Sequence, residues 1–124
     1  MAKKILIIED DKLLRKVIGK KLAMENYKIV EATDGEEGLR LSGSEQPDLI
    51  LLDLILPEIN GFEVLARLKK NPNTFKIPVI ILSNLGDEEK VEKGLKLGAT
   101  DYLIKADLDP GEIVNRIELV LNKK

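Results

Sequence analysis

The sequence contains no cysteine and no histidine, and each absence excludes a class of function. Without cysteine the chain has no disulfide, no thiolate metal site and no cysteine nucleophile. Without histidine it lacks the commonest general base and the commonest transition-metal ligand. No segment approaches the run of about 18 apolar residues that is needed to cross a bilayer. The amino-terminal segment MAKKILIIED also has no apolar run long enough for a signal peptide.

A strong charge of one sign is missing as well. The net charge is −2 and the isoelectric point is about 5.3, so no basic field is available to hold nucleic acid or an anionic membrane. The length of 124 residues suits one domain, and 44% hydrophobic and 34% charged residues suit a globular one. We therefore expect residues 1–124 to form a single cytoplasmic domain that binds neither nucleic acid nor membrane directly.

Short apolar runs alternate with longer segments of helical spacing. The runs are Lys4–Ile8, Lys28–Ala32, Leu49–Leu52, Val79–Leu82 and Tyr102–Ile104. Three of them are apolar on consecutive residues, which is typical of strands buried on both faces of a parallel sheet. Five strands alternating with five helices predict an α/β fold, a doubly wound sandwich with right-handed crossovers. The periodicity does not give the strand order.

The helical segments carry capping signals and amphipathic patterns. Asp34 precedes a short helix expected at roughly 35–41, Gly98 closes the fourth helix, and Asp109-Pro110 begins the last. The first helix is expected to bury one set of residues and to expose another, namely Leu13, Leu14, Val17, Ile18 and Leu22 against Arg15, Lys16, Lys20 and Lys21. Val91, Leu95 and Leu97 mark the apolar side of the fourth helix.

Polar residues follow the strands at their carboxyl ends, where doubly wound folds bind ligands. The first strand is followed by 9–11 (Glu-Asp-Asp), the third by Asp53, the fourth by Ser83 and the fifth by Lys105. Each residue alone has a plain structural explanation; Asp11, for example, is expected to cap the helix that follows it. Their joint occurrence at one edge of the sheet favours a functional site.

Carboxylates clustered beside apolar strands repel one another unless a cation joins them. Since histidine and cysteine are absent, an all-oxygen set suits Mg²⁺, which often shares an anionic phosphate. Magnesium, a carboxylate nucleophile, a lysine and a hydroxyl are the parts required for phosphoryl transfer to an aspartate. The candidate nucleophile is Asp53, which ends the buried run LILLD.

The motifs IIEDD, LLDLILPEINGFE, VIILSN and GATDYLIKA occur in order over nearly the whole chain. Together they resemble the receiver domain of bacterial and archaeal two-component response regulators, of the chemotaxis-regulator type. The resemblance implies a flavodoxin-like (βα)5 fold with strand order 2-1-3-4-5. It also implies a phosphoacceptor signalling domain rather than an enzyme. Its partners would be a sensor histidine kinase or histidine phosphotransfer protein and a downstream output protein or domain.

The same resemblance assigns roles to individual residues. Asp53 matches the phosphoacceptor, and Glu9 and Asp10 match the acidic pair that holds Mg²⁺, with the backbone carbonyl of Ile55 as the remaining protein ligand. Ser83 and Lys105 match the residues that bind the phosphoryl group, and Tyr102 matches the aromatic switch residue, while Pro57 and Gly61 match the loop after the acceptor. There Gly61 is expected to permit a backbone turn that alanine would resist.

Two features distinguish this sequence from the receiver domains that it resembles. Receivers usually have a cis proline after the lysine, and here Ala106 stands in that place, so either a costly cis bond persists or the loop takes another course. Ile55, Leu85 and Asn84 flank the expected path of a water attacking the phosphoryl group. They predict a long-lived phosphorylated state, unless the two apolar residues only pack against each other or a partner.

Two other functions remain as alternatives. A flavodoxin-like FMN carrier should have a Ser-, Thr- and Gly-rich loop after the first strand, but 9–11 is acidic, and two Tyr and two Phe are the only aromatics. A pseudo-receiver, which binds partners without phosphorylation, usually lacks one of the key residues, whereas here they are all present. The sequence alone leaves open whether the domain stands alone or belongs to a longer protein.

Overall fold

The computed structural model describes residues 2–122, so the first residue and the last two of the expected 1–124 domain lie outside the described residues. Five parallel strands form one sheet in the order β2-β1-β3-β4-β5, which confirms the doubly wound fold and the strand order. The strands are β1 (Lys4–Ile8), β2 (Lys28–Ala32), β3 (Leu49–Leu52), β4 (Val79–Ser83) and β5 (Asp101–Ile104).

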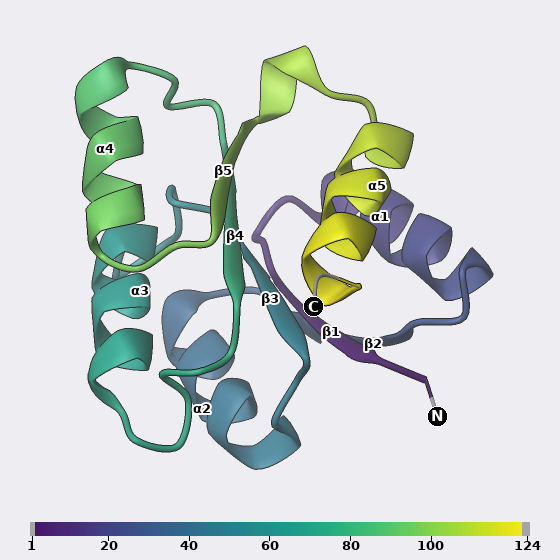
Figure 1. Ribbon diagram of the computed structural model, residues 1–124, viewed down its shortest axis with the longest axis horizontal. Coiled ribbons are helices and arrows are strands. Elements are labelled where there is room, and N and C mark those ends of the chain that lie inside the picture. The colour runs from purple at the N-terminus through teal and green to yellow at the C-terminus, as the bar shows by residue number, and fades with distance from the viewer. Residues whose placement is uncertain (1, 123–124) are drawn as a thin grey trace.

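Helices cover both faces of the sheet (Figure 1). On one face lie α1 (Lys12–Met24) and α5 (Pro110–Leu121), and on the other lie α2 (Gly35–Glu45), α3 (Gly61–Lys70) and α4 (Glu88–Lys96). A short 3₁₀ turn, η1 (Lys105–Asp107), follows β5. No helix within 2–122 is long and apolar enough to span a bilayer.

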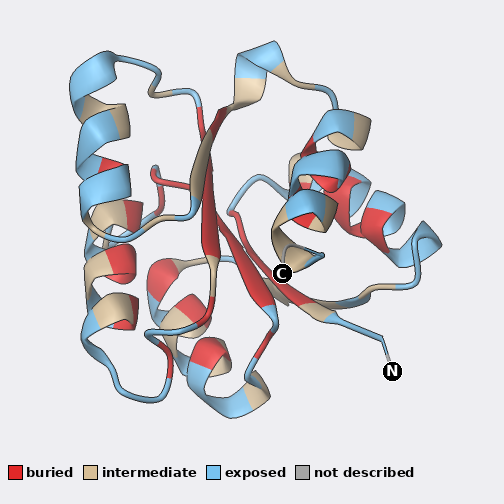
Figure 2. Cartoon of the chain, in the orientation of Figure 1, coloured by how far each residue is buried: buried red, intermediate tan, exposed pale blue. Residues whose placement is uncertain are grey.

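The central strands are buried on both faces, as their continuous apolar runs predict (Figure 2). One apolar layer, containing Leu6, Ile50 and Ile81, packs beneath α2, α3 and α4. The other, containing Ile5 and Ile80, packs beneath α1 and α5. This two-sided core fixes the carboxyl ends of β1, β3 and β4 side by side, where the polar residues follow.

The local helix signals are confirmed. Asp11, Asp34 and Asp109 each accept a hydrogen bond from the backbone N–H three residues later, and Asp109 also forms a capping box with Glu112. Gly98 follows α4 with a φ of +111°, the left-handed conformation that glycine adopts without strain.

Three helix expectations are wrong. In α1, Arg15 is buried at 8% exposure, whereas Leu13 is 75% exposed, so the helix is rotated relative to its apolar pattern. In α4 the side chain of Leu95 is half exposed, because Gly94 is the residue that faces the sheet. The second helix extends to Glu45 rather than ending near Leu41. There the hydroxyl of Ser42 is buried and donates to the carbonyl of Gly38.

Candidate functional site

Three carboxylates meet at the carboxyl edge of the sheet. Glu9 follows β1, Asp53 follows β3, and these strands are paired with Ile8 opposite Leu52. One carboxylate oxygen from each of Glu9, Asp10 and Asp53 lies within 4.8 Å of the other two. Glu9 and Asp53 are buried at 2% and 5% exposure, whereas Asp10 is exposed. The structure thus brings together the three acids that the sequence singled out.

Lys105 reaches this acidic group from the beginning of η1. Its ammonium nitrogen donates a hydrogen bond to Asp53 Oδ2 at 3.2 Å and lies 2.9 Å from Glu9 Oε1. Burial acts to lower the pKa of Lys105, but the two carboxylates outweigh it and raise the pKa, so the side chain stays charged. A fixed positive charge beside Asp53 can bind an anionic group that approaches this carboxylate.

Glu9 is the most perturbed acid of the site. Burial, helped by the charge of Asp53 and opposed by Lys105, raises the pKa of Glu9 from 4.5 to about 7. Oε2 accepts a hydrogen bond from the backbone of Asp11 at 3.0 Å. Oε1 is fully buried and is paired with the Lys105 ammonium at 2.9 Å, while no backbone N–H within 2–122 donates to it.

A buried carboxylate oxygen paired only with the Lys105 ammonium, beside two further carboxylates, fits a divalent cation with oxygen ligands. The donor set holds oxygen only, which suits Mg²⁺ or Mn²⁺ better than Zn²⁺ or Cu²⁺. Glu9, Asp10 and Asp53 are therefore the residues that could hold such an ion. A fourth ligand, the backbone carbonyl of Ile55, stays a prediction.

The carboxylate of Asp53 is held from two sides. Oδ1 accepts a hydrogen bond from the backbone N–H of Ile55 at 3.2 Å, and Oδ2 accepts the bond from Lys105. The loop closes tightly behind it, since a Cβ on Gly61 would collide with the carbonyl oxygen of Asp53 and lie 2.5 Å from Leu54 Cα. Close backbone approach, and not the expected special turn, explains this glycine. The left-handed residue of the loop is Glu58, with φ of 68°.

Ser83 and Tyr102 are joined through one residue. The hydroxyl of Ser83, fully buried at the end of β4, accepts a hydrogen bond from the N–H of Leu85 at 3.1 Å. The hydroxyl of Tyr102 on β5 donates to the carbonyl of the same Leu85. The ring of Tyr102 packs against Gly94 of α4, where an added Cβ would lie 3.1 Å from ring carbon Cδ2. Loop and ring therefore form one packed unit beside the site.

The loop after Lys105 takes another course from the one that a cis bond would give. No peptide bond within 2–122 is cis, and residues 105–107 form a 3₁₀ turn. Lys105 nevertheless contacts both Asp53 and Glu9. The sequence left open either a cis bond before Ala106 or a different course of the loop, and the structure has the different course.

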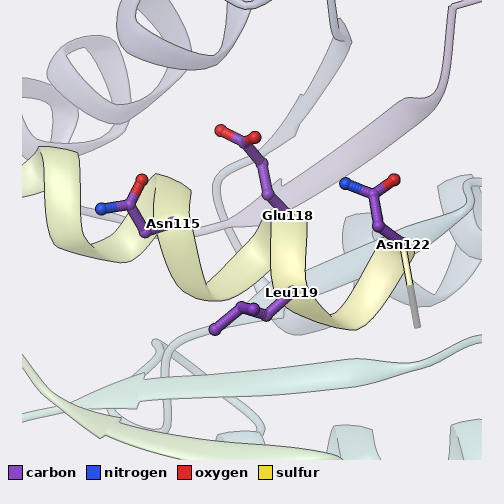
Figure 3. Close-up of a pocket in the computed structure, with 4 residues that line it drawn as sticks. All are labelled: Asn115, Glu118, Leu119 and Asn122. Carbon is purple, nitrogen blue, oxygen red and sulfur yellow. The ribbon is translucent and has the colours of Figure 1, made fainter.

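A hollow elsewhere on the surface lies along the second half of α5, lined by Asn115, Glu118, Leu119 and Asn122 (Figure 3). It offers a single carboxylate, and Glu118 and Leu119 point in different directions from the helix. Since it contains no residue of the acidic group, we place the functional site at the carboxyl edge of the sheet.

The fold and this edge define a doubly wound α/β protein with a lysine-bridged acidic site. The family model of the response regulator receiver domain matches residues 5–118. The chain therefore belongs to the response regulator receiver family, the receiver domains of two-component signal transduction.

Individual relatives agree with this assignment. The DNA-binding dual master transcriptional regulator RpaA of Synechocystis is 39% identical over 97% of this chain and 49% of its own length. The chain thus spans about half the length of the curated relatives it matches. The Francisella response regulator 1452 receiver domain is 32% identical with a TM-score of 0.89, covering 98% of both chains. The Mn²⁺-bound form of response regulator Rcp1 is 31% identical with a TM-score of 0.83, covering 98% and 96%.

Proposed function

We propose that Asp53 accepts a phosphoryl group in a reaction that depends on Mg²⁺. One observation carries this proposal: the buried carboxylate of Asp53 contacts a lysine ammonium and lies within 4.8 Å of an acidic pair. An oxygen of Asp53 forms a bond to phosphorus while the bond from phosphorus to the donor nitrogen or oxygen breaks, and the leaving group takes up a proton from solvent. Lys105 binds a phosphoryl oxygen during this transfer.

Glu9, Asp10, Asp53 and the carbonyl of Ile55 would hold the metal ion. When bound, Mg²⁺ neutralises the acidic group and the charge on the transferred phosphoryl oxygens. The burial of the Glu9 carboxylate beside those of Asp10 and Asp53 supports this role, as does the Mn²⁺-bound form of the relative Rcp1. Without the ion, three carboxylates would repel an anionic phosphodonor.

Ser83 and Tyr102 would convert phosphorylation into a change of surface. In this structure the Ser83 hydroxyl accepts a hydrogen bond from the N–H of Leu85. If the hydroxyl turns to donate to the phosphoryl group, it releases that N–H. Leu85 is also the acceptor of Tyr102, whose ring packs against α4. The charge of the phosphoryl group would thereby shift the conformation of Leu85 and Tyr102, and this shift would reach the face formed by α4, β5 and α5.

The phosphodonor would be a sensor histidine kinase or a histidine phosphotransfer protein, and the target an output protein or domain. We infer that residues 1–124 act as one receiver domain and do not contact DNA themselves, which the net charge of −2 supports. No observation favours a pseudo-receiver, because Lys105 contacts Glu9 and Asp53, and one carboxylate oxygen of Asp10 lies within 4.8 Å of an oxygen from each of these acids.

Incubation with acetyl phosphate and Mg²⁺, followed by measurement of the intact mass, tests the proposal. The protein should gain one phosphoryl group, and the gain should disappear in excess EDTA and in Asp53→Asn. Undiminished labelling of Asp53→Asn would place the nucleophile elsewhere.

A further inference from the structure

Arg15 lies in the first turn of α1 and is the buried cation closest in sequence to the acidic pair. Its Nη1 donates to the backbone carbonyl of Glu9 at 2.9 Å, in a buried hydrogen bond. Its Nε donates to Glu31 Oε1 of β2 at 2.7 Å. The guanidinium therefore bridges three segments, namely α1, β2 and the acidic loop.

The bond to Glu9 completes the fixation of this residue. The N–H of Glu9 already donates to the carbonyl of Ala32 at 3.0 Å, so one backbone group of Glu9 is bonded to β2 and the other to Arg15 of α1. The carbonyl of Glu9 and the N–H of Asp10 belong to one planar peptide unit. Fixing that carbonyl consequently fixes the backbone nitrogen and Cα of Asp10, and Cα is the atom that carries its side chain.

A buried guanidinium is costly unless its donors are paired. Glu31 supplies the paired charge, and the planar guanidinium donates from Nε to Glu31 and from Nη1 to the Glu9 carbonyl, a fork that a lysine ammonium does not reproduce. The neighbouring Lys16 also contacts Glu31, at 3.4 Å, but it is exposed and makes no bond to Glu9. Arg15 and Lys16 thus share one partner and differ in their connection to the acidic loop.

We propose that Arg15 is a positioning residue, which holds the backbone between Glu9 and Asp10 in the arrangement that binds the metal ion. This inference rests on the proposed Mg²⁺ site. It assigns to Arg15 no contact with the ion or with the phosphoryl group. Its action is on metal affinity, through the peptide that carries the two acids.

The test measures Mg²⁺ binding by titration calorimetry for the parent, Arg15→Lys and the matched control Lys16→Ala. Arg15→Lys keeps the charge but loses the two-sided fork, and it should weaken Mg²⁺ binding about fivefold or more, as expected for one lost hydrogen bond to a charged group. Labelling by acetyl phosphate at saturating Mg²⁺ should stay close to the parent rate. Lys16→Ala should bind Mg²⁺ as the parent does.

Equal Mg²⁺ affinity in Arg15→Lys and Lys16→Ala would overturn the proposal, since Arg15 would then only join α1 to β2. If Arg15→Lys does not fold, Glu31→Gln decides, because it removes the anchor of the guanidinium and leaves Arg15 in place. Weaker Mg²⁺ binding in Glu31→Gln supports the proposal, and unchanged binding refutes it. Failure of the Mg²⁺ site itself is separate, because the parent would then bind no Mg²⁺.

Discussion

Replacing Glu9 by glutamine should remove a pH dependence of folding stability in metal-free buffer. The pKa of Glu9 is raised from 4.5 to about 7 in the folded protein, chiefly by burial. The native state therefore binds this proton more tightly than the unfolded state does. Protonation of Glu9 stabilises the fold most at low pH, and the contribution is lost as the pH rises from 4.5 through about 7.

The size of the effect follows from the same two values. The difference between 4.5 and about 7, at about 1.4 kcal/mol for each pH unit, sets an upper limit of about 3–4 kcal/mol. Glutamine keeps the size of the side chain but does not titrate. Between about pH 4.5 and pH 8, the parent should therefore lose up to about 3–4 kcal/mol of unfolding free energy relative to Glu9→Gln.

Urea unfolding of both proteins in EDTA, at half-unit pH steps, measures this difference. Subtracting one protein from the other cancels the titration of all other groups that the substitution leaves unchanged. Adding Mg²⁺ at pH 8 should restore stability to the parent, because the ion neutralises the same charge. Parallel pH profiles for the parent and Glu9→Gln would refute a buried, proton-binding Glu9.

Further predictions concern the metal, the loop and the lifetime of the phosphorylated state. Mg²⁺ at a hundred times its dissociation constant should stabilise the fold by about 2.7 kcal/mol, and Asp10→Ala should abolish the corresponding rise in melting temperature. Gly61→Ala should lower the unfolding free energy by about 1–3 kcal/mol through backbone collision, while Gly43→Ala, which has open space around it, should not. The double variant Ile55→Asn with Leu85→Glu should dephosphorylate at least severalfold faster than the parent. An equal or slower rate would contradict shielding by these side chains.

The sequence was most informative where the interactions are local. Asp11, Asp34 and Asp109 cap their helices through bonds that span three residues, so a short window of sequence contains both partners. The strands followed from apolar runs for a similar reason, although β4 ends one residue later and β5 begins one residue earlier than these runs predicted. Strand order depends on pairing between distant segments, and it came only from the family resemblance.

The errors at Arg15 and Ala106 have long-range causes, whereas the one at Ser42 is local. Arg15 reads as part of the charged face of its helix, but its partner Glu31 lies on another strand, and that bond draws it inward. The second helix continues past Leu41, and the hydroxyl of Ser42 bonds within the helix to Gly38 one turn earlier. The course of the chain at Ala106 also depends on packing around Lys105, which no local pattern contains.

The acceptor residue can be located chemically. After incubation with acetyl phosphate and Mg²⁺, borohydride reduces an aspartyl phosphate to the alcohol, so that the phosphorylated aspartate becomes homoserine. Peptide fragmentation by mass spectrometry then identifies the modified position. We predict homoserine at position 53, with Asp10 and Asp11 intact and with no conversion when Mg²⁺ is removed. Homoserine at another position, with Asp53 unmodified, would contradict the proposed function.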